Sequence, residues 1–161
     1  MPVLLTILGN TYEYPIPGED PNWSNDATDW ASAVTDALTT LLGSGDILNS
    51  SFAIANNTSS ATDINGLIFA PGTVRAANIT YSIYRESDST TSGYSETGTI
   101  YVTYDNNAAA LSKWVLGKTS VGTSGVNFSI LDSGQVQYTS TDIGAAGYSG
   151  VIKFSAKTLA Q

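Results

Sequence analysis

The sequence contains no cysteine and no histidine among its 161 residues. Without cysteine the chain forms no disulfide and offers no thiolate nucleophile. Without histidine it lacks the most frequent general base and the commonest transition-metal ligand. A Ser/Lys pair or carboxylates would have to carry any catalysis, and neither a Ser-x-x-Lys nor a Gly-x-Ser-x-Gly motif occurs. We therefore expect a non-enzymatic protein with no catalytic residues, no cofactor and no bound metal.

Charge is also scarce, since 12% of residues are charged, and 14 acidic against 6 basic residues give a net charge of -8. This charge repels the phosphate backbone of nucleic acids, so we expect no nucleic-acid binding. No segment approaches the 18 or more apolar residues that a membrane-spanning helix needs. The short apolar start at residues 3–8 lacks the positive region and cleavage site of a signal peptide. Neither membrane insertion nor secretion by a signal peptide is expected.

The acidic residues are concentrated near the N-terminus. Residues 1–50 contain no Lys or Arg, and their acidic residues are Glu13, Glu19, Asp20, Asp26, Asp29, Asp36 and Asp46. Two interpretations stay open: a solvated acidic arm, or a docking surface for a basic patch on a partner.

The N-terminal segment begins with a β-prone apolar run, Val3 to Leu8, followed by a stretch that ends in Tyr12-Glu13-Tyr14. Prolines at positions 15, 17 and 21 then forbid a helix and weaken any central strand. The pattern predicts one N-terminal strand that leads into an extended, Pro-rich arm.

An amphipathic helix is predicted at about residues 27–42. Asn25 or Asp26 can cap its start, and Gly43 stands where a left-handed C-cap belongs. The apolar residues Trp30, Val34, Ala37, Leu38 and Leu41 fall at helical spacing on one side. A helix of this length is marginal alone in water, so it has to pack against the fold or a neighbouring subunit.

From residue 50 onward the hydrophobic period changes to two, with turn residues between short runs. Ala77 to Tyr84 is the clearest strand, and Gly98 to Tyr104 is its expected antiparallel mate across a polar loop at 85–97. About eight such strands predict a mainly β fold: a single β-sandwich or jelly-roll-like domain at residues 50–161, preceded by an attachment arm at residues 1–49.

Three groups of motifs resemble a known class of proteins. They are Tyr12-Glu13-Tyr14-Pro15 with residues 22–31, Thr73-Val74-Arg75-Ala76 with residues 81–85, and residues 134–140 with residues 147–154. Together they resemble structural proteins on the virions of tailed bacteriophages, which occur as small stand-alone chains and as modules of tail fibres. The resemblance implies synthesis in the host cytoplasm, a place on the outer surface of the virion, a homotrimer, and the major capsid protein or other virion proteins as partners.

Three functions compete on this basis. The first is a capsid decoration (cement) or head-fibre protein on the outer head surface. The second is a tail-fibre or receptor-binding module whose strand loops and tyrosines touch a host surface glycan. The third is a polysaccharide hydrolase that uses paired carboxylates. The candidates for the assembly interface all lie in the N-terminal arm: Leu4, Leu5, Tyr12, Tyr14, Trp23, Trp30, Val34 and Leu38.

Overall fold

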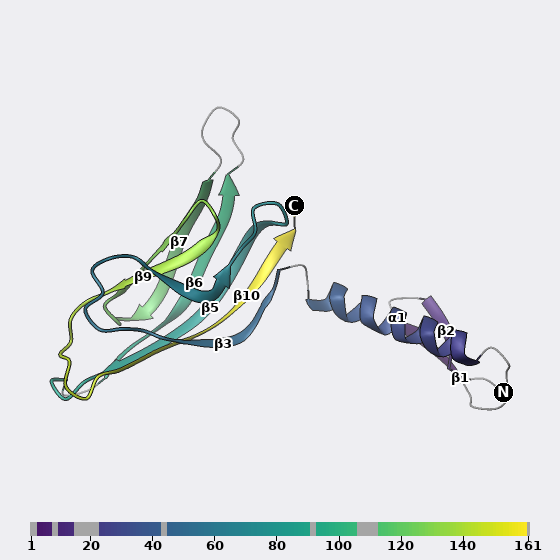
Figure 1. The fold of residues 1–161 in the computed structure, drawn as a ribbon, viewed down its shortest axis with the longest axis horizontal. Helices are drawn as coiled ribbons and strands as arrows, with labels where there is room; N and C mark the ends of the chain where they lie inside the picture. The colour runs from purple at the N-terminus through teal and green to yellow at the C-terminus, as the bar shows by residue number, and fades with distance from the viewer. Residues whose placement is uncertain are drawn as a thin grey trace. The chain divides into compact units, whose positions relative to one another are not determined.

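The computed structural model of the chain describes residues 3–7, 10–14, 23–42, 45–90, 93–105 and 113–160. The chain divides into two compact units, Met1–Gly43 and Ser44–Gln161 (Figure 1). The division thus falls between residues 43 and 44 and not between 49 and 50. Residues 47–49 belong to β3 (Ile47–Ala53), which pairs within the second unit.

The first unit contains a β-hairpin of β1 (Val3–Ile7) and β2 (Asn10–Tyr14). The two strands are antiparallel, and their register places Leu5 opposite Tyr12. The sequence predicted one strand and an extended arm, so the second strand is a correction. Residues 11–14 have the alternating, aromatic-rich pattern that strands accept, and a short connection lets them pair back on β1. The prolines at 15, 17 and 21 lie outside the described residues.

The helix α1 (Trp23–Leu42) ends where the sequence predicted but begins earlier. Asn25 and Asp26 therefore lie inside its first turn and do not cap it, which corrects the predicted start at about residue 27. An acidic side chain in the first turn still interacts favourably with the helix dipole. The expected C-cap at residue 43 lies outside the described residues.

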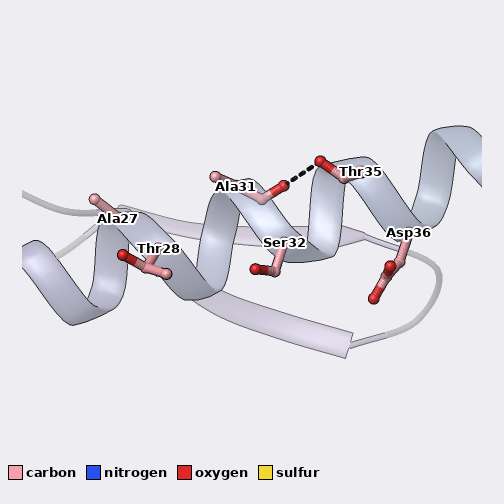
Figure 2. A pocket seen from close by; sticks show the side chains of 6 residues that line it. All are labelled: Ala27, Thr28, Ala31, Ser32, Thr35 and Asp36. Atoms are coloured by element: carbon pink, nitrogen blue, oxygen red, sulfur yellow. Dashed lines mark hydrogen bonds between the residues drawn. The ribbon is translucent and has the colours of Figure 1, made fainter.

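One side of α1 packs against β2 and β1. On this side Ala33 is buried, and Trp30, Val34 and Ala37 are half-buried, which confirms the amphipathic character of the helix. Leu38, which was expected on the same side, is 53% exposed. The opposite side carries small and polar side chains around a shallow depression (Figure 2), lined by Ala27, Thr28, Ala31, Ser32, Thr35 and Asp36.

The second unit is an antiparallel β-sandwich, as the sequence predicted. Besides β3, its strands are β4 (Thr62–Ile68), β5 (Val74–Glu86), β6 (Tyr94–Asp105), β7 (Lys113–Gly122), β8 (Val126–Ile130), β9 (Gln135–Ser140) and β10 (Ser149–Ala160). One sheet has five strands in the order β3-β10-β5-β6-β7, and the other has three in the order β4-β9-β8.

The predicted pairing of β5 with β6 is confirmed, with Ile79 opposite Ile100. Both strands are longer than expected, because β5 continues to Glu86 and β6 starts at Tyr94. Arg85 and Glu96, assigned to a polar loop by the sequence, are therefore strand residues. Ser and Thr alternate with the inner residues here, and strands accept them on an outer face.

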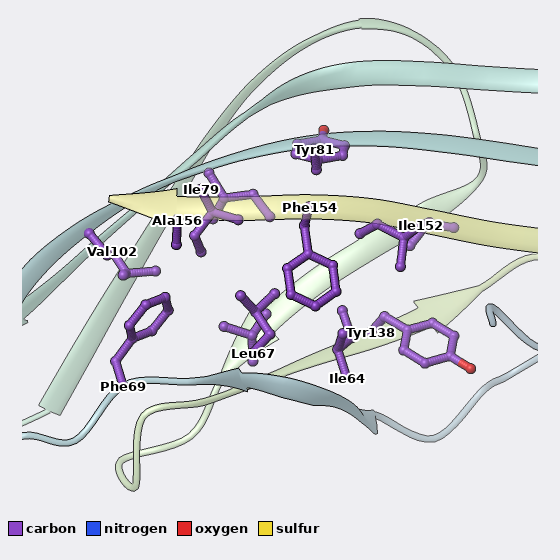
Figure 3. Packing of buried hydrophobic residues seen from close by; sticks show 14 of the residues in the cluster. Ile64, Leu67, Phe69, Ile79, Tyr81, Val102, Tyr138, Ile152, Phe154 and Ala156 are labelled. Atoms are coloured by element: carbon purple, nitrogen blue, oxygen red, sulfur yellow. The ribbon is translucent and has the colours of Figure 1, made fainter. Parts of the chain in front are cut away.

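The core lies between the inner faces of the two sheets (Figure 3). The five-stranded sheet contributes Ile79, Tyr81, Ile152 and Phe154, among other buried side chains. The three-stranded sheet contributes Ile64, Leu67 and Tyr138. Ile64 and Leu67 both face the core although they are three residues apart, because Gly66 has a φ of +84° and interrupts the alternation of β4. Each large apolar side chain buried here contributes about 1.5–3 kcal/mol.

Candidate functional site

The two ends of the sandwich differ in what they carry. The chain enters β3 at Ile47, opposite Ala156 of β10, and β10 finishes at Ala160, opposite Val74, at the same end of the sheet. At the other end Ser149 lies opposite Glu86. β10 has 12 residues, so the two ends are roughly 35–40 Å apart at the usual strand rise. The far end carries the β3–β4, β5–β6, β7–β8 and β9–β10 loops (Figure 1).

Asp46 fixes the entry point of the chain. One carboxylate oxygen accepts hydrogen bonds from the backbone N–H of Thr158 at 2.7 Å and from its hydroxyl at 2.9 Å. The other oxygen lies 2.7 Å from Nζ of Lys157. The Lys157 ammonium group, together with the Thr158 hydrogen bonds, lowers the pKa of Asp46 despite the opposing effect of burial. Asp46, which the sequence assigned to the acidic arm, therefore belongs to the sandwich.

Arg85 organises the loop end. Its side chain is fully buried, and Nη1 donates a hydrogen bond of 2.6 Å to the carbonyl of Ser124. Nη2 donates to the carbonyl of Thr141 at 2.6 Å and to Oδ1 of Asn56 at 3.2 Å. Nε donates to the hydroxyl of Tyr148 at 3.1 Å. The rigid fork of the guanidinium group therefore joins three loops to the end of β5.

Tyr148 and Asn56 extend these connections. The Tyr148 hydroxyl donates to the carbonyl of Ile54 at 2.7 Å, and the ring lies 5.7 Å from the Arg85 guanidinium carbon. The amide of Asn56 donates to Oδ1 of Asp142 at 2.9 Å. Asp142 also accepts the backbone N–H of Gly144 at 2.9 Å. This N–H and the Asn56 amide lower the pKa of Asp142, so its exposed carboxylate is ionised at neutral pH.

The β5–β6 loop joins the same network. The hydroxyl of Ser87 donates to the carbonyl of Ile143, and the N–H of Asp88 donates to the carbonyl of Ala146 at 2.9 Å. Four loops thus form one hydrogen-bonded surface. Its exposed side chains are hydrogen-bonding and partly acidic: Asn57, Asp88, Ser89 and Asp142. Two exposed tyrosines, Tyr84 and Tyr94, stand near the same ends of β5 and β6.

A second buried polar group, Glu96, lies beside the Arg85 network. One carboxylate oxygen accepts hydrogen bonds from the Tyr81 hydroxyl at 2.6 Å and from Nζ of Lys118 at 2.8 Å. The other accepts the N–H of Ser124 at 3.1 Å and its hydroxyl at 2.6 Å. Burial opposes ionisation of Glu96, but these hydrogen bonds outweigh it and lower its pKa to about 2. Burial and Glu96 in turn raise the pKa of Tyr81.

Ser124 links the two networks, because its carbonyl accepts from Arg85 while its N–H and hydroxyl donate to Glu96. Both carboxylate oxygens of Glu96 are occupied by donors of the protein itself. The arrangement therefore holds the β7–β8 loop in place, and Glu96 acts as a structural group.

The predicted assembly residues all lie in the first unit. Leu4 and Leu5 are in β1, Tyr12 and Tyr14 in β2, and Trp23, Trp30, Val34 and Leu38 in α1. The hairpin register brings Leu5 opposite Tyr12. Trp30 and Val34 lie on the side of α1 that packs on the hairpin, and Leu38 is exposed. Their role in assembly stays a prediction.

Sequence reasoning missed Arg85 and Glu96. Arg85 continues the period of Ile79, Tyr81 and Ile83, and this alternation is the signal that could have placed it inside. In the described ranges, no group of three or more His, Cys, Asp or Glu side chains could hold a metal ion. Nor does the described part of the chain contain a helix long and apolar enough to cross a membrane.

No protein-family model matches the sequence, and no curated protein matches it. Among solved structures, the tailspike protein of Acinetobacter phage vB_ApiP_P1 is similar over 69% of this chain, with 16% sequence identity and a TM-score of 0.46. The similar region covers 22% of the tailspike chain.

Proposed function

We propose that this chain is a non-enzymatic structural protein on the virion of a tailed phage, and that the loop end of its β-sandwich recognises a saccharide of the host surface. The first unit, in this proposal, attaches the chain to the particle. The observation that carries the proposal is the buried Arg85, which holds three loops together at the end farthest from the chain entry. The sequence motifs that resemble phage virion proteins support a location on the virion.

A rigid loop surface suits recognition, because less conformational entropy is lost when a ligand binds to loops that are already ordered. Carboxylate, amide and hydroxyl groups can bond to sugar hydroxyls, and Tyr84 and Tyr94 offer exposed rings with a polar end. The exposed carboxylates of Asp88 and Asp142 would repel an acidic polymer. We therefore infer a neutral or amine-bearing saccharide.

Head decoration is the second candidate. The observation that favours it is the charge of residues 1–50, which include no Lys or Arg and would suit a basic patch on a capsid protein. The two candidates differ in what the sandwich does, since a decoration protein needs no ligand at its loop end.

The test is co-sedimentation of the full chain with host cells, with isolated phage tails, and with heads stripped of accessory proteins. We expect saturable binding to cells that Asp142→Ala and Asp88→Ala weaken at least fivefold. Asp132→Ala is the matched control, because Asp132 is an exposed aspartate in the β8–β9 turn at the opposite end of the sandwich. Binding to stripped heads alone would overturn recognition in favour of decoration, and release of sugar from host polysaccharide would make the protein a hydrolase.

A further inference from the structure

The outer face of the five-stranded sheet carries rows of hydroxyl groups. The register aligns Ser155 of β10 with Thr80 of β5, Thr80 with Thr99 of β6, and Thr99 with Thr119 of β7. These four residues point away from the core, since they alternate with buried positions on β5, β6 and β10. One row of hydroxyls therefore crosses four adjacent strands.

The neighbouring rows on β5, β6 and β7 are uncharged as well. Their outward residues are Ser82, Thr97 and Val121 on one side, and Asn78, Tyr101 and Gly117 on the other. A typical protein surface has charges at roughly a quarter to a third of its positions. The uncharged face is therefore unusual for a water-exposed surface, and the charges that border it include Lys153 and Lys157 on β10 and the opposed Asp105 and Lys113 on β6 and β7.

Apolar side chains are exposed on this face. Val121 is 77% exposed, Tyr101 is 47% exposed, and Val115 in the next row is 45% exposed. A shallow depression crosses the face, with Thr80, Thr99 and Thr119 in its lining. Few charges and an exposed aromatic ring are characteristic of the central part of protein interfaces.

We propose that this face, the outer surface of β5, β6 and β7, is an interface with a second copy of the same chain. Every copy carries a net charge of -8, so copies repel one another least where the surface is uncharged. A hydroxyl group both donates and accepts hydrogen bonds, so a face of Ser and Thr is complementary to itself. A charged face would instead need a partner of opposite sign.

The size of the face fits a weak, reversible contact. With strands about 4.8 Å apart and outward residues about 6.8 Å apart along each strand, three strands and four rows span roughly 15 by 27 Å with their side chains. Two copies would bury about 800 Å² in total, which is in the range of weak and transient contacts. The interface lies on the sheet face and not on the loop end, so it does not depend on saccharide recognition.

The absence of cysteine gives a direct test. Thr119→Cys places the single thiol of the chain on the proposed interface, and Ser129→Cys, an exposed position on β8 of the other sheet, is the matched control. In the full-length protein at high concentration, we expect a maleimide reagent to label Thr119→Cys at least tenfold more slowly than Ser129→Cys. Dilution should bring the two rates together, and equal rates at high concentration would overturn the proposal.

A charged variant distinguishes slow labelling caused by the interface from slow labelling caused by shielding of the thiol within one copy. Val121→Glu introduces a carboxylate at the most exposed large apolar side chain of the face, and Ser129→Glu introduces the same charge on the other sheet. In the Thr119→Cys background, Val121→Glu should restore fast labelling, whereas Ser129→Glu should leave it slow. Slow labelling that persists in a folded Val121→Glu protein would show that the thiol is shielded within one copy, and this would refute the interface.

Discussion

The sandwich and the part of α1 whose side chains are described differ greatly in how deeply their side chains are buried. The sandwich has a continuous core, in which Ile79, Ile100 and Ile152 have no measurable exposure. In the helix of the first unit, among residues 27–38, Ala33 alone is buried. A two-stranded hairpin is marginal in water, and units of about 40 residues usually need an additional partner. We therefore expect the sandwich to be stable by itself, and we predict that the first unit needs a partner for its stability.

The largest effect should come from the core of the sandwich. Phe154 is 3% exposed, so Phe154→Ala should lower the free energy of unfolding by about 3–5 kcal/mol. Urea denaturation of the full chain measures it, and Lys153→Ala, on the outer face of the same strand, is the control. A loss below about 1 kcal/mol would mean that the core adapts easily and that the contrast between the units is weaker than described.

Acid should weaken the sandwich through Glu96. Its pKa is lowered in the folded state to about 2 from 4.5, so its ionised form stabilises the fold above pH 4.5. This contribution, about 3 kcal/mol at neutral pH, is lost as the pH falls from about 4.5 to about 2. Urea midpoints of the native protein and of Glu96→Gln should therefore differ at pH 7 and converge near pH 2. A difference that does not depend on pH would contradict the proposed ionisation.

Removal of the Arg85 hydrogen bonds, which join three loops to β5, should have a somewhat smaller effect on stability. Arg85→Met leaves the buried carbonyl of Ser124 and the partly buried carbonyl of Thr141 without their shortest hydrogen bonds, which should cost about 2–3 kcal/mol. Amide hydrogen exchange in residues 141–148 should also become faster, because the loops lose their common partner. Arg75→Met, at an exposed position on β5, should change stability by less than about 0.5 kcal/mol. Equal effects of the two substitutions would show that the Arg85 hydrogen bonds do not hold the loops together.

The smallest effect is expected in the first unit. Truncation of a fully buried tryptophan to alanine costs about 3–5 kcal/mol. Trp30 is only half-buried, so we expect Trp30→Ala to cost about 1–2 kcal/mol, confined to the helix. Circular dichroism at 222 nm should show the loss of helix at a lower temperature, with Asp29→Ala as the exposed control. A parallel shift of the sandwich transition would show that the two units do not unfold independently.

The strands of the sandwich were predictable where one face is apolar. The alternation of Ile79, Tyr81 and Ile83 set both the strand and its buried side, and Asp132-Ser133-Gly134 marked the turn between β8 and β9. The hairpin of the first unit was not predictable, because the prolines that follow Tyr14 suggested an extended arm. The helix start was missed because Asn25 and Asp26 have the chemistry of caps but lie within the first turn.

The contacts at the loop end could not be predicted from the sequence, for a different reason. Two of the four hydrogen bonds of Arg85 go to backbone carbonyls, which every residue type has, so no sequence pattern predicts them. Glu96 finds its partners Tyr81, Lys118 and Ser124 on three other segments. Such contacts depend on strand order, which local patterns do not encode. The assembly role of the residues from Leu4 to Leu38 in the first unit stays a prediction.

The opposite placement of chain entry and loops has a mechanical consequence. Tension between a bound surface and the first unit would run parallel to β3 and would load its hydrogen bonds to β10 in shear. In shear, the bonds along Ile47–Ala53 resist together, whereas in peeling they would break one after another. Asp46, bonded to Lys157 and Thr158, ties down the point where the pull would enter. If the loop end is bound and the first unit is attached as proposed, the sandwich would act as a stiff link between the two attachment points.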